Sequence, residues 1–228
     1  MIEKDSGKVS RNCYLDEAPM LSETIKKENI ASMLCEAARL WQKNAAELSD
    51  IDSRFGDGDH GVAMGKIAAL VLVRADEWLG GSGESIKNFL ERLASGVMGV
   101  GGGSAGPLYG TLIEGMSAPL GDETEIDAKT LAAMLAAGRD ALFEVTKARQ
   151  GDKTMMDAVI PAVEAAEKEA DIASILSAAA AAATAGAKDT EGMASKFGRA
   201  RNYGDATLGT KDAGALSASL FFEGLNKG

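Results

Sequence analysis

Apolar residues recur at intervals of three and four positions along most of the chain, and this spacing predicts helices. One such run covers residues 30 to 48, with Ile30, Met33, Leu34, Ala37, Ala38, Trp41, Ala45 and Leu48. An apolar stripe of this spacing covers one face of an α-helix. The pattern returns in residues 84–98, 131–142, 155–163, 171–186 and after Gly214. We find no convincing alternation of apolar and polar residues. We therefore predict an all-α protein of eight helices.

The pattern also indicates how the chain is organised. Residues 1–22 are polar and aperiodic, so we expect an N-terminal tail there and a single domain over residues 23–228. Three irregular, glycine-containing stretches interrupt the helices, at residues 48–61, 99–110 and 188–213. Long ordered loops in a compact domain tend to be functional. If the helices alternate up and down, these loops would meet at one end.

Charge and cysteine content narrow the classes of partner. The chain has 24 Lys and Arg against 34 Asp and Glu, a formal charge of −10, which argues against nucleic acid and anionic membranes as partners. No apolar run is long enough to cross a bilayer. Cys13 and Cys35 have no metal-ligand spacing, so we expect free thiols and a cytoplasmic location.

The densest chemistry lies in the acidic loop, residues 52–61. Asp57 and Asp59 flank Gly58, and an extended loop would direct both carboxylates to one side, within reach of Asp52. Three close carboxylates repel one another, and a hard divalent cation relieves that repulsion. The loop therefore favours a metal-bridged phosphate site. The alternative is an exposed Asp/Gly turn in which Asp caps a helix.

Three better-known motifs do not account for this loop. Residues 56–61 match the G-x-G-x-x-G fingerprint in form, but that motif needs a preceding strand, and its two aspartates would repel a pyrophosphate. The calcium-loop pattern fails at Gly61, Val62 and Ala68, and no Walker-type phosphate loop is present. A lone histidine is more often structural, but His60 beside Asp59 is a candidate hydrogen-bond donor to a ligand.

Further loops carry groups that suit an anion. Residues 101–110, GGGSAGPLYG, allow close approach of the backbone, and Pro107 suits the first turn of a following helix. Residues 151–157 open another helix with Lys153 and Thr154 as polar candidates. A capped helix start is an equally good interpretation of that segment. Arginines in GRARNYG (198–204) could meet phosphate or neutralise nearby acids.

Taken in order, GDGDHG (56–61), GGGSAGPLYG (101–110), GDKTMMDA (151–158), GRARNYG (198–204) and DAGA (212–215) resemble the L subunit, or L domain, of dihydroxyacetone kinases. The resemblance spans roughly residues 24–226. It implies an eight-helix antiparallel barrel with the nucleotide in loops at one end. It is less similar to the related domain of fatty-acid kinases, which carries Thr where this chain has His60.

The resemblance implies roles for particular residues. Asp52, Asp57 and Asp59 correspond to carboxylates that hold two Mg²⁺ ions. The implied contacts to ADP or ATP are His60, Gly61, Gly103, Ser104, Met155, Arg199, Asp212 and Gly214. On the nucleotide side of the reaction, positioning and charge neutralisation suffice for phosphoryl transfer. No further catalytic residue is expected in this chain.

The resemblance also implies partners. In the family a separate K subunit or domain binds the ketose covalently through a histidine, whereas the only histidine here belongs to the acidic loop. We therefore expect a kinase subunit that needs a K-type partner. The resemblance fits ATP as the phosphoryl donor, and it equally fits ADP held as a cofactor and recharged by a phosphocarrier protein. The sequence leaves open whether the chain forms a homodimer. A non-catalytic nucleotide-binding regulator is the alternative.

Three positions depart from the family pattern. Ala63 stands where many relatives have Asn, Ala105 where Ser is frequent, and Ala213 where Pro is usual. The missing side chains would alter phosphate contacts or loop rigidity. They also suggest a paralogue that acts on a different sugar, such as a tetrulose.

Overall fold

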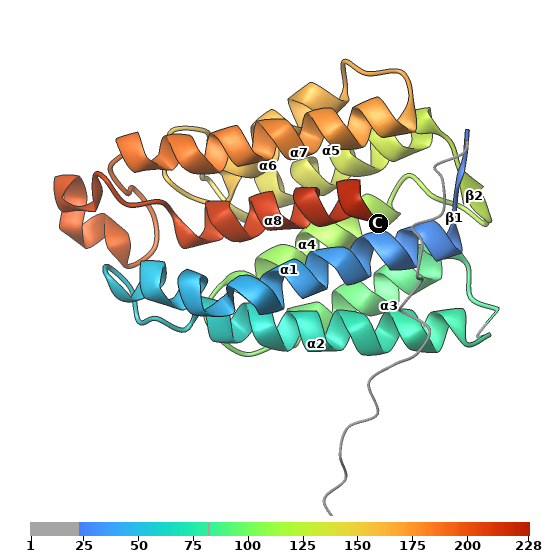
Figure 1. The fold of residues 1–228 in the computed structure, drawn as a ribbon, viewed down its shortest axis with the longest axis horizontal. Helices are drawn as coiled ribbons and strands as arrows, with labels where there is room; N and C mark the ends of the chain where they lie inside the picture. Colours follow the sequence, from blue (N-terminus) through green and yellow to red (C-terminus); the bar gives the residue numbers. More distant parts are fainter. Residues whose placement is uncertain (1–22, 82) are drawn as a thin grey trace, which may run out of the picture.

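The computed structural model describes residues 23–81 and 83–228, most of which are helical (Figure 1). The α-helices of this part are α1 (Lys27–Ser53), α2 (His60–Leu79), α3 (Ile86–Met98), α4 (Ala105–Ser117), α5 (Ala128–Val145), α6 (Met156–Ala166), α7 (Ile172–Asp189) and α8 (Ala213–Lys227). Two 3-10 helices, η1 (Thr190–Gly192) and η2 (Ala200–Thr207), lie between α7 and α8. The prediction of an all-α protein is confirmed, with the expected eight α-helices. The predicted tail, residues 1–22, lies outside the described residues.

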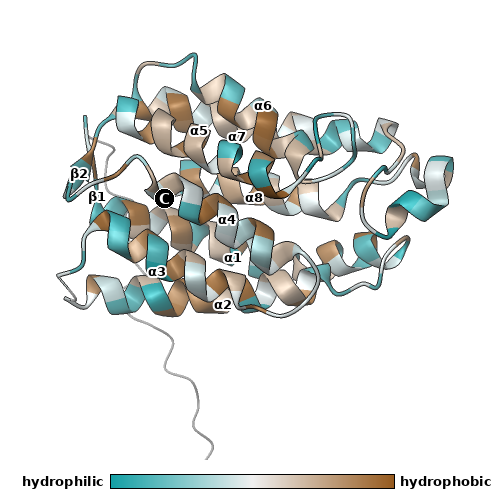
Figure 2. Ribbon diagram, turned by 180° about the vertical axis from the view of Figure 1, so that it is seen from behind, coloured by the Kyte–Doolittle hydropathy of each residue, from teal (hydrophilic) through white to brown (hydrophobic). Residues whose placement is uncertain are grey.

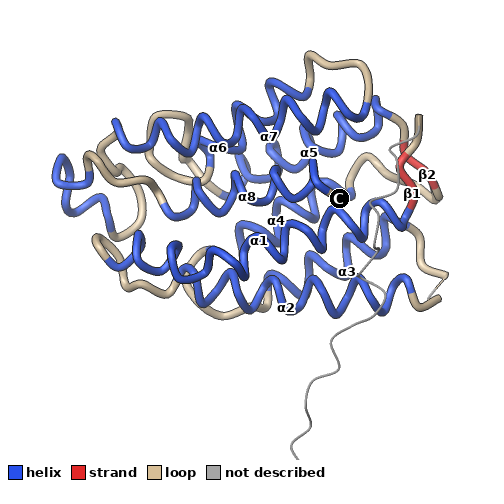
Figure 3. Tube along the Cα trace, in the orientation of Figure 1, coloured by secondary structure: helices blue, strands red, loops and turns tan. Residues whose placement is uncertain are grey.

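The helices form a closed ring. Each helix packs beside the next one along the chain, and α8 returns to α1. Among neighbouring helices, α2 with α3 and α5 with α6 have the least extensive contacts. Successive helices run in opposite directions, so their connections alternate between the two ends (Figures 1 and 3). One end carries the long loops and the 3-10 helices, as Figure 3 shows in tan and blue.

The other end carries a small feature that the apolar pattern did not predict. Strand β1 (Ile25–Lys26) pairs antiparallel with β2 (Glu125–Ile126), and Ile25 lies opposite Ile126. Two-residue strands are too short to show any alternation. Both isoleucines are buried, so the pair closes this end of the ring over the core.

Aromatic side chains fill the centre of the ring. Trp41 of α1 lies edge-on to Tyr109 of α4, with ring centroids 5.0 Å apart, and stacks on Phe221 of α8 at 5.9 Å. All three are at most 1% exposed. Figure 2 shows that apolar residues dominate the helices and that hydrophilic residues are frequent in the loops and outer turns. The cluster therefore joins three helices of the ring directly.

Small residues allow neighbouring helices to approach closely. A Cβ atom on Gly224 of α8 would overlap the backbone of Ala37 in α1, and one on Gly186 of α7 would overlap the carbonyl of Asp157 in α6. Helix pairs of this kind bring their backbones into contact where a larger side chain would separate them. The abundance of Ala and Gly thus reflects packing between helices.

The same packing corrects several predicted boundaries. Residue Gly186, expected to end the alanine-rich helix, lies inside α7, which continues to Asp189. The irregular stretches 48–61 and 99–110 shrink to 54–59 and 99–104, because α1, α2 and α4 extend into them. Gly106 lies inside α4, where a Cβ atom would come within 2.5 Å of the Val100 carbonyl oxygen. By contrast, the start of α3 follows the local sequence, since the Ser85 side chain accepts from the Asn88 amide and caps the helix.

The cysteines differ from expectation. Cys35 is buried and disulfide-bonded, so the expected free thiol is wrong at that position. Cys13 lies outside the described residues. The cytoplasmic location rested on free thiols and therefore stays a prediction. Within residues 23–81 and 83–228, the helices are too short or too polar to cross a membrane.

Candidate functional site

The connections at one end of the ring enclose a cavity of about 540 Å³. They join α1 to α2, α3 to α4, α5 to α6, and α7 to α8, so every connection at this end contributes to the wall. The residues predicted for the site that line the cavity are Asp52, Asp57, Asp59, His60, Gly103, Ser104, Met155, Arg199, Asp212 and Gly214. A cavity of this size suits a small-molecule ligand.

Gly61 is the one predicted site residue that does not line the cavity. It is buried in α2 against α1, where a Cβ atom would overlap the carbonyl oxygen of Ala45. The close contact between α1 and α2 therefore requires a glycine at this position. That contact holds the start of α2, and with it Asp59 and His60, beside the end of α1.

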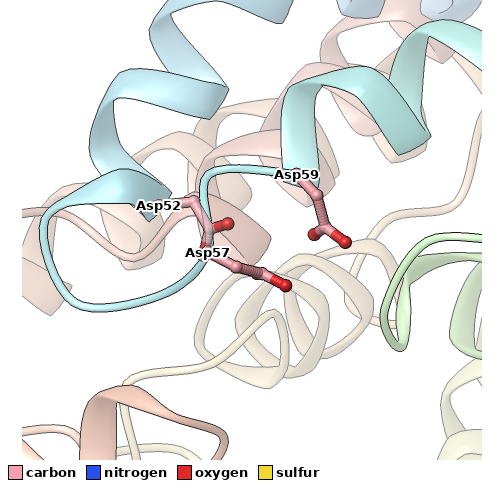
Figure 4. A group of neighbouring side chains, drawn as sticks. All are labelled: Asp52, Asp57 and Asp59. Atoms are coloured by element: carbon pink, nitrogen blue, oxygen red, sulfur yellow. The ribbon is translucent and has the colours of Figure 1, made fainter.

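Three carboxylates converge on one side of the cavity. Asp52 lies in the last turn of α1, Asp57 in the loop, and Asp59 at the residue preceding α2. Each offers an oxygen within 4.8 Å of the others (Figure 4). The expected extended loop is wrong, because Gly58 has φ +74° and turns the chain. The turn, together with the end of α1, is what gathers the three acids.

Within the part of the chain that the structure describes, few protein donors occupy these carboxylates. There, Asp59 makes no side-chain capping hydrogen bond to α2, and Asp52 accepts a long contact, 3.4 Å, from the His60 amide. Arg199 forms an ion pair with Asp57 from across the cavity mouth. Carboxylate oxygens with free lone pairs are the donors that hard cations such as Mg²⁺ bind. The donor set therefore fits a divalent cation.

Two helix N-termini open onto the other walls. Helix α4 begins directly after Ser104 and α6 directly after Met155, and neither of these residues caps its helix through its side chain. The first amide groups of a helix lack intrahelical partners and carry partial positive charge. Ser104 and Met155 both line the cavity. At α6 the amides of Met156 and Asp157 already donate to Thr154, so an anion in the cavity would find its backbone donors at the start of α4.

His60 is tied to the protein interior. Its Nε2 atom lies 2.9 Å from the hydroxyl oxygen of Ser217, and burial lowers the pKa of the imidazole, against an opposing effect of Asp52. The Ser217 hydroxyl accepts from Tyr109 at 2.8 Å and donates to the Gly214 carbonyl at 3.0 Å. The imidazole also makes a hydrogen bond with the backbone of Ala213, the first residue of α8. His60 thereby anchors α2 to α8 at the base of the cavity.

Asp212 closes the base of the cavity at the start of α8. Its carboxylate accepts from the Ala215 amide at 2.8 Å and caps the helix. Removal from water raises the pKa of Asp212 to about 7; the Ala215 hydrogen bond opposes this rise, and the charge of Asp157 adds to it. Its neighbour Asp157 is fully buried and accepts from the amides of Gly151 and Thr154. These acids shape the loops that carry the cavity wall.

Sequence reasoning missed two groups at the site. Phe55, which lines the cavity, packs against Tyr203 of η2 with ring centroids 5.4 Å apart, although they are 148 positions apart in the chain. No local pattern links such distant positions. Lys153 was recognised only as a polar candidate, whereas it is almost fully buried and binds the segment between α7 and α8.

The three departures from the family pattern all lie at or beside the cavity. Ala105 and Ala213 line it, each at the first position of a helix. Ala63 is buried in α2, beneath Gly102 of the glycine loop, where a Cβ on Gly102 would come within 3.2 Å of the Ala63 Cβ.

Comparison with known proteins gives the family. Residues 54–227 match the DAK2 domain model, so the chain belongs to the DAK2 domain family. It is a DhaL-type protein: it is 34% identical over 202 residues to the ADP-binding subunit DhaL of the PEP-dependent dihydroxyacetone kinase 2 of Listeria innocua, covering 86% of this chain and 93% of that one. The family resemblance is therefore confirmed.

Longer relatives match over part of their length. The L-erythrulose kinase of Pectobacterium atrosepticum is 31% identical over 204 residues, which cover 86% of this chain but only 34% of that protein. The crystal structure of the dihydroxyacetone kinase from C. freundii with AMP-PNP and Mg²⁺ has a similar fold, with a TM-score of 0.64 and 24% identity, over 92% of this chain and 35% of that one. The chain thus spans about a third of these relatives.

Proposed function

We propose that this chain is the nucleotide-binding subunit of a dihydroxyacetone-type kinase. It holds ADP or ATP with Mg²⁺ and passes a phosphoryl group to a small ketose carried by a separate K-type subunit. The observation that carries the proposal is the convergence of Asp52, Asp57 and Asp59 within 4.8 Å on the wall of a 540 Å³ cavity. Metal-bridged phosphates are the ligands that such a donor set takes.

The three aspartates would hold two Mg²⁺ ions. When bound, these ions would neutralise the charge of the nucleotide phosphates. Asp59 is free to turn its carboxylate to a ligand, because it makes no side-chain capping hydrogen bond to its helix. Asp57 would hold the metal in place of Arg199, whose guanidinium would then be available to the nucleotide phosphates.

The nucleotide lies across the remaining walls. Backbone amides after Ser104, at the start of α4, donate to phosphate oxygens. Gly103, with φ +60°, gives the loop the turn that brings these amides into the cavity. Met155 and Gly214 give an apolar surface on the far wall. His60 keeps α8 and Asp212 in place beneath the ligand.

The length of the match supports the subunit arrangement. The chain aligns with 93% of a DhaL protein that is named as a separate ADP-binding subunit, but with 34% of an erythrulose kinase. The remainder of that longer protein would be supplied here by the K-type partner. The relatives named for dihydroxyacetone and for erythrulose support a triose or a tetrulose as the ketose.

Reconstitution of this chain with a K subunit tests whether a phosphoryl group is transferred to the ketose. The purified chain is mixed with the K subunit of a dihydroxyacetone kinase and Mg²⁺, with either ATP or ADP plus the phosphocarrier system as phosphoryl source. Formation of dihydroxyacetone phosphate or erythrulose phosphate is then followed. We expect product only when both subunits are present. Product from this chain alone would contradict the division of labour, and nucleotide binding without product under either source would identify a regulatory paralogue.

A further inference from the structure

Lys153 occupies an unusual backbone position for its residue type. It lies in the loop between α5 and α6 with φ +60°, the only non-glycine residue with positive φ in the described part of the chain. Such a conformation is strained for a residue with a side chain. Asp157 maintains the turn by accepting from Gly151 and Thr154 on either side. A strained backbone maintained in this way directs the Lys153 side chain inward.

The ammonium group of Lys153 lies in a cage of backbone carbonyl oxygens. Its Nζ atom donates to Thr190 at 2.8 Å, Thr207 at 2.7 Å, Met193 at 3.0 Å and Thr210 at 2.5 Å. The residue is 4% exposed. An ammonium group has three hydrogens, so four acceptors exceed its donors. The arrangement is that of a cation surrounded by carbonyl dipoles, as in sites for monovalent cations.

These four carbonyls belong to separate parts of one segment. They come from η1, from the residue that follows it, from the end of η2, and from Thr210 close to α8. The segment is otherwise irregular, and it carries Arg199 to the cavity mouth. Thr190 also accepts the Asp212 amide at 2.9 Å through its hydroxyl oxygen. The charge of Lys153 therefore connects four points of this segment to the loop between α5 and α6.

We propose that Lys153 is a tethered cation that replaces a free monovalent ion and holds residues 190–210 against the cavity. It is a positioning residue: it lines the cavity, but its ammonium group is occupied by the four carbonyls, so it acts on the ligand through Arg199 and Asp212. The effect on nucleotide affinity rests on the proposed function, whereas the carbonyl cage itself does not.

Lys153→Ala tests the cage by cation rescue. Both residues carry a Cβ, so the backbone strain is kept while the charge is removed. Hydrogen–deuterium exchange of peptides from residues 190–210 is measured in tetramethylammonium, sodium, potassium and ammonium chloride at equal ionic strength. We expect exchange to rise by at least about tenfold in tetramethylammonium. Potassium or ammonium, which fit the vacated cage, should restore the protection of residues 190–210. The proposal would be overturned if the substitution left exchange unchanged, or if all four salts restored protection equally.

Lys196→Ala is the matched control. Lys196 bridges the same two segments from outside, donating to the Gly151 carbonyl and to Asp152 at 2.9 Å, but its side chain is 60% exposed. Its removal should leave no cation-specific effect on residues 190–210. A potassium rescue as large as that of Lys153→Ala would show that the effect does not come from the cage.

A measurement on the unaltered chain covers the case in which Lys153→Ala does not fold. Acetylation of each lysine is followed by mass spectrometry, and Lys153 should react at least about tenfold more slowly than Lys196. Equal rates would overturn the cage. ADP affinity of Lys153→Ala, compared between potassium and tetramethylammonium, then tests the link to the ligand. If the unaltered chain fails to bind ADP, the proposed function falls, and the exchange and labelling results still decide on the cage.

Discussion

The Nε2 atom of His60 lies 2.9 Å from the hydroxyl oxygen of Ser217, which is 157 positions further along the chain. Through this contact the start of α2 meets the first turns of α8. Tyr109 of α4 donates to the same hydroxyl, and the indole of Trp41 in α1 donates to the Ser217 carbonyl at 2.8 Å. One serine therefore joins four helices directly below the cavity, so the geometry of the site depends on it.

Ser217→Ala should destabilise the fold and loosen the cavity base. The change leaves the buried hydroxyl of Tyr109 without its acceptor, which costs about 1–3 kcal/mol of unfolding free energy. Ser219→Ala is the control, because Ser219 is also buried in α8 but donates only within its own helix, to Leu216. Urea unfolding measures both. An equal loss in the two variants would contradict the role given to Ser217.

Two glycines of α2 should respond in opposite ways to alanine. A Cβ on Gly61 would overlap the Ala45 carbonyl, so Gly61→Ala must push α1 and α2 apart, at a cost of about 1–3 kcal/mol. Gly65, one turn later, has open space around it, so Gly65→Ala should stabilise the helix by up to about 1 kcal/mol. Thermal unfolding compares them. A similar shift in both variants would show that Gly61 is not needed for helix contact.

Asp212 should make stability depend on pH. Removal from water raises the pKa of Asp212 to about 7 in the folded protein, above the value near 3.9 of an unfolded chain. The folded state therefore holds the proton more tightly, and this stabilisation, present below about pH 4, is lost as the pH rises through 7. In the absence of divalent cations, Asp212→Asn should thus gain roughly 1–3 kcal/mol relative to the wild type between pH 4 and 7.

Asp171→Asn provides the comparison for that experiment. Asp171 caps α7 at the surface, and its hydrogen bonds from the Ser174 amide lower the pKa of its carboxyl. A carboxyl with a lowered pKa stabilises the folded protein at pH values above the pKa of the unfolded chain. This stabilisation is lost only in more acidic solution. The two variants should therefore differ in the sign of their pH dependence. Parallel profiles would contradict the environment described for Asp212.

Features that depend on near neighbours in the chain were predictable. The stripe ending at Leu48 and the cap at Ser85 follow from local spacing, and the structure has both. The acidic loop was also recognisable, because its three aspartates lie within eight residues. The shape of the loop was not predictable, because the sequence alone gives no sign that Gly58 adopts a positive φ.

Features that depend on distant partners were not predictable. Glycine is typical both of loops and of close helix contacts, so Gly106 and Gly186 were assigned to loop and helix end, although each lies within a helix against a neighbour. The partners of Lys153 lie 37 to 57 positions away. No periodicity connects a lysine with carbonyl oxygens at that range.

Calorimetric titration with ADP, with and without Mg²⁺, tests the central claim most directly. It compares the wild type, Asp57→Ala, and the control Asp50→Asn, whose exposed carboxylate pairs with Arg54 outside the cluster. We expect Mg²⁺-dependent binding in the wild type and in Asp50→Asn, weakened by at least about a hundredfold in Asp57→Ala. Binding that is indifferent to Mg²⁺ and to Asp57, or no binding at all, would contradict a metal–nucleotide site in this cavity.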